Sequence, residues 1–108
     1  MDKKRDKDGS VDFFIACVLK LKDAAEARSF FEDVCTVQEL RAIGQRLSVA
    51  HMLGEGWVYS DIVDSTGAST ATVSRVSRSF NYGNGGYQTV FPRLSGDERS
   101  LLPSKEKS

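Results

Sequence analysis

The chain has 108 residues, of which 40% are hydrophobic and 28% are charged, and its formal net charge is zero. This is the size and composition of one globular domain, with a core small enough that a second subunit could complete it. The zero charge gives no compositional support for nucleic-acid binding, although phosphate contacts need only a local positive surface.

No segment of the sequence suggests a membrane protein or an exported one. The longest apolar run, Phe13–Leu19, is far shorter than the roughly 20 residues that span a bilayer. The acidic residues of the first twelve offset the basic ones, whereas a signal peptide starts with net positive charge. We expect a cytoplasmic protein with no membrane contact.

The two ends of the chain are polar. We expect residues 1–10 to be a flexible, solvated tail, with Asp8 or Ser10 capping the helix that follows. Residues 95–108 are expected to form a second flexible tail. Residues 11–94 are left as the folded domain.

Two helices are predicted in the first third of the domain. Val11–Lys22 is apolar nearly all round, and such a helix must be covered on every side, so a partner subunit is its natural cover. Asp23–Val34 has apolar residues at helical spacing and Asp23 as its cap. Cys17 and Cys35 have no CxxC or Cys/His context, so we expect reduced, packed thiols rather than a metal site.

A capping box predicts the start of the next helix. Thr36 precedes Glu39 by three residues, and the helix should run to about Leu53, before two glycines. Its expected inward stripe consists of Leu40, Ile43, Leu47 and Ala50. His51, the single histidine, has only Glu55 one turn away, which suggests a weak pair. No acid-base or nucleophile constellation is present, so we expect no enzyme.

A helix-turn-helix is predicted from Tyr59 to about Phe80. Gly67 can supply the sharp turn between two tightly crossing helices. Ser60 or Asp61 could cap the first helix, and Ser69 the second. The positions that should pack inward are apolar at the required spacing: Ile62, Val63, Ala68, Val73, Val76 and Phe80. A loop at residues 81–86 and a short helix near Tyr87–Leu94 should follow.

The outward face of the second helix carries small, hydroxylated or basic side chains. Such a face at a helix N-terminus can enter the major groove of DNA, while its free N–H groups and basic side chains favour phosphate. The residues we expect to contact DNA are Ser69, Thr70, Ala71, Thr72, Ser74, Arg75 and Arg78. One alternative is a plain helical hairpin with no binding role. The other is a protein-interaction module that uses the same surface, and the zero net charge of the chain supports this alternative.

The sequence also resembles the Trp repressor superfamily, most closely its YerC/YecD group. The resemblance covers about residues 11 to 90. It rests on four segments: Phe30–Thr36, Gln45–Leu47, Thr66–Val76 and Asn81–Tyr87. The run Gly-Ala-Ser-Thr-Ala-Thr-Val-Ser-Arg and the block Asn-Tyr-Gly-Asn within them are together specific. It implies an all-α fold, an intertwined homodimer, and a repressor of transcription whose helix from Ser69 to Ser79 reads the major groove of double-stranded DNA.

The resemblance also implies a possible effector site. Arg46 and Arg75 match the two arginines that sandwich tryptophan in the repressor, Thr36 matches a residue beside that pocket, and Ser79 matches one that meets the amino group. Val76 stands where the repressor has a glycine that lines the indole slot. We therefore expect either no ligand or one other than L-tryptophan, with ion pairing and phosphate contact as alternative roles for the arginines.

Overall fold

The structure of the protein is a computed structural model that describes residues 8–103. The chain divides between Leu40 and Arg41 into two compact units. All regular elements in residues 8–103 are helices, as the sequence predicted, and none of them is long and apolar enough to cross a membrane.

The first unit contains α1 (Ser10–Val18) and α2 (Ala24–Val34). Their rings form a small aromatic cluster. Phe14 lies 6.2 Å from both Phe30 and Phe31 between ring centroids, and Phe30 and Phe31 are 5.3 Å apart. Neither helix has a fully buried residue, and Phe13 is 73% exposed. The apolar surface of α1 is therefore largely uncovered within one chain.

The first helix is shorter than predicted, because it ends at Val18 rather than near Lys22. Asp23 is held in extended backbone as the N-cap of α2, where its carboxylate accepts a hydrogen bond from the N–H of Glu26. The N–H of Lys22 in turn donates to the carboxylate of Glu26 at 2.9 Å. These contacts start α2 and exclude helical backbone at the residues just before it.

The expected caps of α1 are only partly right. Gly9 is the N-cap, and Asp8 accepts a hydrogen bond from the N–H of Ser10 at 3.0 Å. This hydrogen bond lowers the pKa of Asp8 from its ordinary value. The pKa of Asp8 is lower in the folded chain than in the unfolded chain. The stabilisation is therefore present at neutral pH and is lost as the pH falls through the pKa of the folded state. Residues 1–7, the rest of the predicted tail, lie outside the described residues.

The third helix, α3, spans Val37–Gly54 and begins at the predicted capping box. The hydroxyl of Thr36 accepts from the N–H of Glu39 at 3.0 Å, and the carboxylate of Glu39 accepts from the N–H of Thr36 at 2.8 Å. These reciprocal bonds satisfy two backbone donors at the start of the helix. The chain leaves α3 through Gly56, which has a positive φ of 85°.

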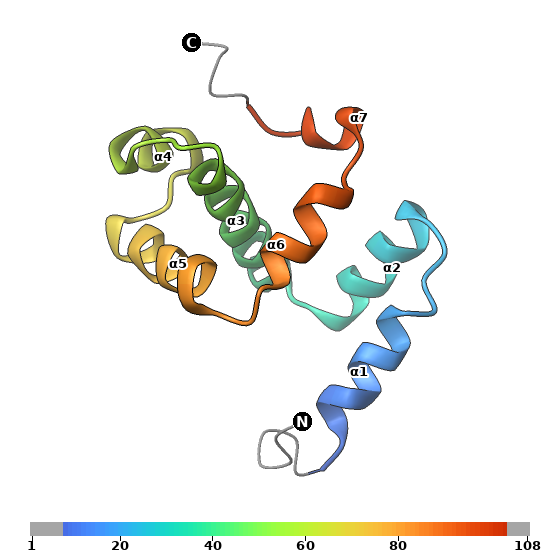
Figure 1. The fold of residues 1–108 in the computed structure, drawn as a ribbon. Coiled ribbons are helices and arrows are strands. Elements are labelled where there is room, and N and C mark those ends of the chain that lie inside the picture. Colours follow the sequence, from blue (N-terminus) through green and yellow to red (C-terminus); the bar gives the residue numbers. More distant parts are fainter. Residues whose placement is uncertain (1–7, 104–108) are drawn as a thin grey trace. The chain divides into compact units, whose positions relative to one another are not determined.

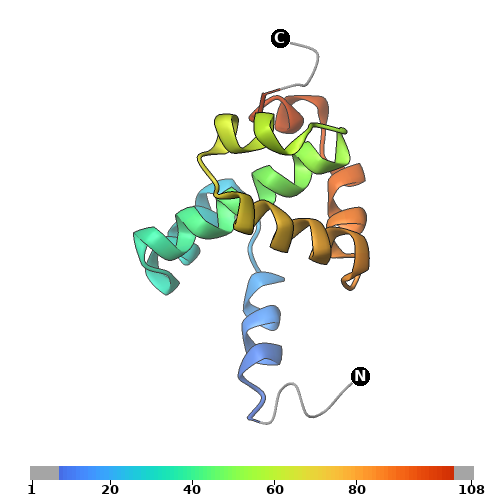
Figure 2. The same cartoon turned by 90° about the vertical axis from the view of Figure 1, so that its left-hand side faces the viewer.

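The second unit contains the rest of α3 and the helices that follow it. These are α4 (Tyr59–Thr66), α5 (Thr70–Tyr82), α6 (Gly86–Val90), the 3-10 helix η2 (Phe91–Arg93) and α7 (Gly96–Arg99). In Figure 1, α4 and α5 lie on one side of α3 and α6 lies on the other. Figure 2 turns α5 toward the viewer, with α4 above it. The buried core comprises Val49, Ala50, Met52, Ile62, Ala68, Val73 and Val76.

The inward stripe of α3 differs from the predicted one. Ala50 is fully buried as expected, but Ile43 is 37% exposed and Leu47 is 42% exposed. Val49 and Met52 take the inward positions instead, because α4 and α5 pack against that side of the helix. Ile43 and Leu47 are left on the surface of the single chain.

Two further boundaries differ from the prediction. Val58 is the N-cap of α4, and Ser60 and Asp61 are already helical because the N–H of Asp61 donates to the carbonyl of Val58. The predicted cap at either of those residues is therefore wrong. The expected polar tail from residue 95 contains α7, which starts with a capping box between Ser95 and Glu98. Residues 104–108 lie outside the described residues.

Candidate nucleic-acid interface

The turn between α4 and α5 is built around Gly67, as predicted. Gly67 ends α4 with a φ of 75°, and its N–H donates to the carbonyl of Val63 at 2.9 Å. The hydroxyl of Thr66 donates to the carbonyl of Ile62 at 2.7 Å and accepts from the N–H of Ala68 at 3.1 Å. Ala68 is buried. The turn is therefore fixed by hydrogen bonds and by packing.

Gly67→Ala is expected to destabilise the protein by about 1 kcal/mol, because left-handed backbone costs a residue with a Cβ roughly that much. No heavy atom lies within 4 Å of the added Cβ, so the cost comes from the backbone conformation and not from a clash. Urea unfolding measures this, with Gly67→Asn as the comparison, since asparagine enters the left-handed region more easily. Equal stability of Gly67→Ala and the wild type would contradict this account of the turn.

Helix α5 starts at a side-chain cap and has two distinct faces. Ser69 is the N-cap, and its hydroxyl accepts from the N–H of Thr72 at 3.1 Å, as predicted. Val73 and Val76 are buried against the core, and Phe80 packs against it. These inward positions agree with the predicted spacing. Because α5 is anchored along this side, its other side is held at the surface.

Six of the seven predicted DNA-contacting residues are exposed. They are Ser69, Thr70, Ala71, Ser74, Arg75 and Arg78. Thr72 is half-buried, and its hydroxyl is 3.1 Å from that of Ser69. Thr72 therefore lies at the border of the face and helps to fix the helix start.

The exposed face of α5 is basic. The helix contains Arg75 and Arg78 and no acidic residue. In residues 8–103, ion pairs join Arg28 to Glu32 and His51 to Glu55, and neither α5 arginine takes part in one. Both guanidinium groups are thus available to an external anion. The zero net charge of the whole chain does not carry over to this surface.

A cavity of about 350 Å³ lies beside the inner edge of this face. It is lined by residues of α3, α5 and α6: Ala42, Gln45, Arg46, Thr72, Arg75, Val76, Ser79 and Tyr87. The structure thus brings together Arg46, Arg75 and Ser79, three of the four residues named for an effector site. The fourth, Thr36, lies in the first unit and caps α3.

Three residues of this cavity were not predicted as site residues from the sequence: Ala42, Gln45 and Tyr87. Gln45 and Tyr87 belong to segments that carry the resemblance, and Tyr87 was also expected to begin a short helix. Tyr87 belongs to an aromatic row, 5.9 Å from Phe80 and 5.6 Å from Phe91 between ring centroids. No sequence spacing indicates this arrangement, because it depends on how α6 returns to α5.

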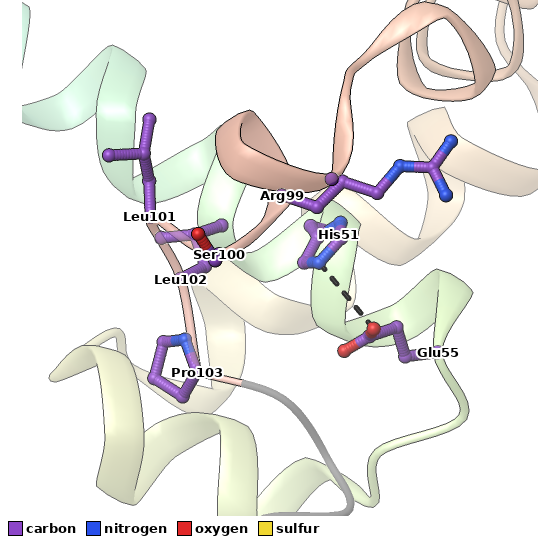
Figure 3. A pocket seen from close by; sticks show the side chains of 8 residues that line it. His51, Glu55, Arg99, Ser100, Leu101, Leu102 and Pro103 are labelled. Atoms are coloured by element: carbon purple, nitrogen blue, oxygen red, sulfur yellow. Dashed lines mark ion pairs between the residues drawn. The ribbon is translucent and has the colours of Figure 1, made fainter.

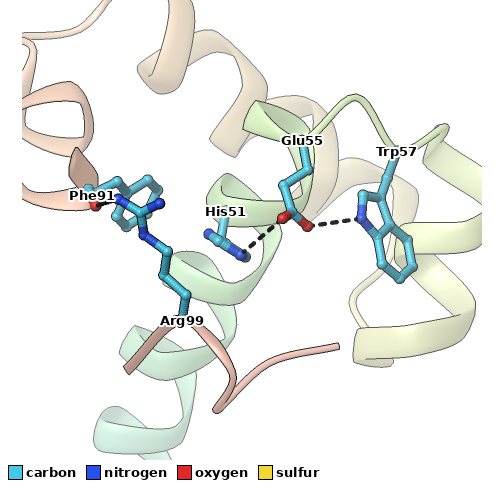
Figure 4. Close-up of polar contacts among 5 residues, drawn as sticks. All are labelled: His51, Glu55, Trp57, Phe91 and Arg99. Atoms are coloured by element: carbon cyan, nitrogen blue, oxygen red, sulfur yellow. Dashed lines mark hydrogen bonds and ion pairs between the residues drawn. The ribbon is translucent and has the colours of Figure 1, made fainter. Parts of the chain in front are cut away.

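A second cavity, of about 620 Å³, lies at the C-terminal end of α3 (Figure 3). Its polar groups are largely engaged within the chain (Figure 4). His51 Nε2 lies 3.7 Å from Glu55 Oε2, which is the weak pair expected from the sequence. Trp57 Nε1 donates to Glu55 Oε1 at 3.2 Å. Arg99 donates to the backbone carbonyls of Phe91 and Pro92, each at 3.3 Å, and thereby links α7 to η2.

Comparison with known proteins assigns the chain to a family. Residues 9–95 match the family profile described as Trp repressor protein. The chain is 46% identical to YerC of Bacillus subtilis (strain 168), a protein described as uncharacterized, over 91% of this chain and 92% of YerC. The chain belongs to the Trp repressor family. The matched region contains α4, the turn at Gly67 and α5.

Two solved structures of the Trp repressor type share this fold. A TrpR-like protein from Eubacterium eligens ATCC 27750 has a TM-score of 0.81 and 48% identity, over 94% of this chain and 99% of that one. A candidate Trp repressor from Staphylococcus aureus has a TM-score of 0.79 and 35% identity, over 96% and 98%. The Trp-repressor-like fold expected from the sequence is therefore confirmed.

Within this Trp-repressor-like frame, Val76 has a double role. It is a core residue, 3% exposed, and it also lines the cavity between Arg46 and Arg75. Its branched side chain therefore forms part of the cavity wall. The expectation of no ligand, or of one other than L-tryptophan, stays a prediction.

Proposed function

We propose that this protein is a sequence-specific DNA-binding regulator of transcription, a cytoplasmic repressor that reads the major groove with α5. The observation that carries the proposal is the exposed face of α5, which combines small and hydroxylated side chains with two arginines that form no ion pair within residues 8–103, while α5 contains no acidic residue. Membership of the Trp repressor family, one of non-enzymatic DNA-binding regulators, supports the same reading.

The proposed division of labour follows the position of each residue on α5. Thr70, Ala71 and Ser74 lie in its first turns and are small enough to let the helix approach base edges closely. Arg75 and Arg78 lie further along, where their long side chains can reach phosphates. The backbone N–H groups at the helix start add a favourable site for a phosphate.

We also propose that the active form is a homodimer. The proposal is supported by the apolar surface that one chain leaves uncovered. Phe13 and Ile15 on α1 are exposed, as are Ile43 and Leu47 on α3. Covering them with a second copy would remove apolar surface from water at about 25 cal/mol per Å². A dimer would also place two copies of α5 on successive major grooves, about 34 Å apart on a pseudo-palindromic site.

The alternative is a protein-interaction module that uses the same helical surface. The zero net charge of the chain is the observation in its favour, but the local charge of α5 favours DNA. The cavity beside Arg46 and Arg75 could bind an effector other than tryptophan. The two guanidinium groups there would suit an anionic group of that effector.

Selection of bound DNA from a random-sequence pool tests the proposal. The purified protein is expected to enrich a two-fold symmetric site and to bind it with strong salt dependence. Repeating the selection with amino-acid mixtures tests for an effector. If the folded protein enriches no sequence and shows no salt-dependent DNA binding, the proposed function is wrong and the interaction module becomes the better hypothesis.

Thr70→Ala and Ser74→Ala are expected to change which sequence is enriched, each by about 1 kcal/mol of discrimination at one or two base positions. The reason is that these hydroxyls lie on the exposed face near the start of α5, where base edges would be read. Ser100→Ala is the control, because Ser100 lies outside α5, just after α7, and its hydroxyl donates to the carbonyl of Asp97. An unchanged preference in both variants would argue against base reading by this face.

A further inference from the structure

Gln45 links α3 to the end of α4, although 21 residues separate it from its partner. The side-chain amide of this half-buried residue donates from Nε2 to the carbonyl oxygen of Thr66 at 3.3 Å. Thr66 is the last residue of α4 and directly precedes Gly67. The final carbonyls of a helix have no partner within the helix, so an external donor is needed to satisfy them.

The hydrogen bond from Gln45 completes the fixing of the turn. The hydroxyl of Thr66 is already held by the carbonyl of Ile62 and by the N–H of Ala68. These two bonds fix the turn to α4 and to the residue that follows it, but not to α3. Gln45 supplies the connection to α3, the helix against which both α4 and α5 pack. Only three residues separate Thr66 from Thr70, where α5 begins.

We infer that Gln45 is a positioning residue for DNA reading: by holding the Thr66 carbonyl it sets where α5 starts, and so how Ser69–Arg78 is presented to DNA. The inference rests on the proposed function. Gln45 touches no DNA in this account, because its amide faces the turn and its side chain lines the cavity beside Arg46 and Arg75. Its effect is therefore on the geometry of the recognition helix and not on its charge.

The expected consequence is a loss of selectivity more than of general affinity. Phosphate contacts by Arg75 and Arg78 tolerate small shifts of the helix, because long side chains can follow a phosphate. Contacts to base edges are directional and do not tolerate such shifts. Without the Gln45 hydrogen bond, binding to the selected sequence should weaken while binding to random DNA stays close to that of the wild type.

The test compares Gln45→Met with the wild type. Methionine keeps the length of the side chain and removes the donor. We expect binding to the selected sequence to weaken by about threefold to tenfold, the effect of one hydrogen bond of about 1 kcal/mol. Random-sequence DNA should bind unchanged. Amide hydrogen exchange at Gly67 and Ala68, measured without DNA, should accelerate by a similar factor.

Two further variants sharpen the test. Gln45→Glu places a carboxylate opposite the Thr66 carbonyl and should weaken specific binding more than Gln45→Met does. Ser48→Ala is the matched control, because the hydroxyl of Ser48 donates to the carbonyl of Gly44 within α3 itself. This control should change neither exchange at the turn nor selectivity. If one glutamine variant fails to fold, the other carries the comparison.

The inference is overturned if a folded glutamine variant keeps wild-type exchange at Gly67 and Ala68, or loses specific and random binding equally. If the wild type itself binds no DNA, the proposed function fails. In that case the exchange measurement alone decides whether Gln45 holds the turn, so the two failures can be told apart.

Discussion

Replacing Arg75 and Arg78 together with alanine is expected to weaken DNA binding by roughly tenfold to a hundredfold at moderate salt, for selected and random sequences alike. Both guanidinium groups lie on the exposed face of α5 and neither is used in an ion pair within residues 8–103. Each lost phosphate contact should also reduce the slope of log affinity against log salt by about 0.9. Titrations at several salt concentrations measure both effects.

Arg93→Ala is the control for that double variant. Arg93 is an exposed arginine in η2, away from α5. Removing its charge changes the net charge of the chain without changing the proposed interface, so the salt slope should stay near that of the wild type. The Arg93→Ala variant removes one arginine, and the Arg75→Ala/Arg78→Ala variant removes two. If each removed arginine reduces the salt slope equally in both variants, the α5 face is not the phosphate-binding surface.

Phe13→Asp is expected to convert a dimer into a monomer, raising its dissociation constant by about 100-fold or more, because a dimer interface would bury the new charge without a partner. Phe13 is 73% exposed in the single chain, so the substitution leaves the aromatic cluster of Phe14, Phe30 and Phe31 in place. Analytical ultracentrifugation measures the change. Loss of the dimer should also abolish cooperative binding to a two-fold symmetric site.

Leu101→Asp is the matched control for the dimer. It makes the same change of charge at an apolar side chain that is 82% exposed but lies far along the chain, after α7. This variant should remain a dimer. A wild-type protein that is monomeric at micromolar concentration, or a Phe13→Asp variant that dimerises normally, would contradict the proposed role of α1.

Local patterns in the sequence predicted those parts of the fold that depend on neighbouring residues. Asp23, Thr36 and Ser69 were expected as caps, and each accepts the hydrogen bond expected of it, because a cap and its donor lie within three residues. Ile62 and Val73 were expected in the core, and both are fully buried. Around Gly67, the sharp turn sets which positions of the two flanking helices must pack inward, and those positions are apolar. This part of the sequence therefore predicted both the turn and the core positions beside it.

Other parts could not be predicted in this way. Val58 caps α4 without a side-chain acceptor, so its sequence carries no capping signal. The side of α3 that faces inward depends on where α4 and α5 pack, which its own apolar pattern does not contain. The start of α7 was missed although Ser95 and Glu98 have the spacing of a capping box, a signal that could have been used.

The candidate site shows the same division. Its exposed face follows from helical spacing along α5, which the sequence contains. The hydrogen bond from Gln45 to Thr66 joins residues 21 positions apart, and no periodicity or motif indicates such a pair. Tyr87 likewise lines the cavity only because α6 packs back toward α5, an arrangement that no sequence pattern indicates.

The most direct test of the central claim is hydrogen exchange of the full-length protein with and without its selected DNA. We expect DNA to slow exchange at the amides from Ser69 to Arg78 and to leave the amides of α7, on another part of the second unit, unchanged. Protection elsewhere on the chain, with α5 exchanging as fast as in the free protein, would contradict the assignment of α5 as the DNA-reading helix.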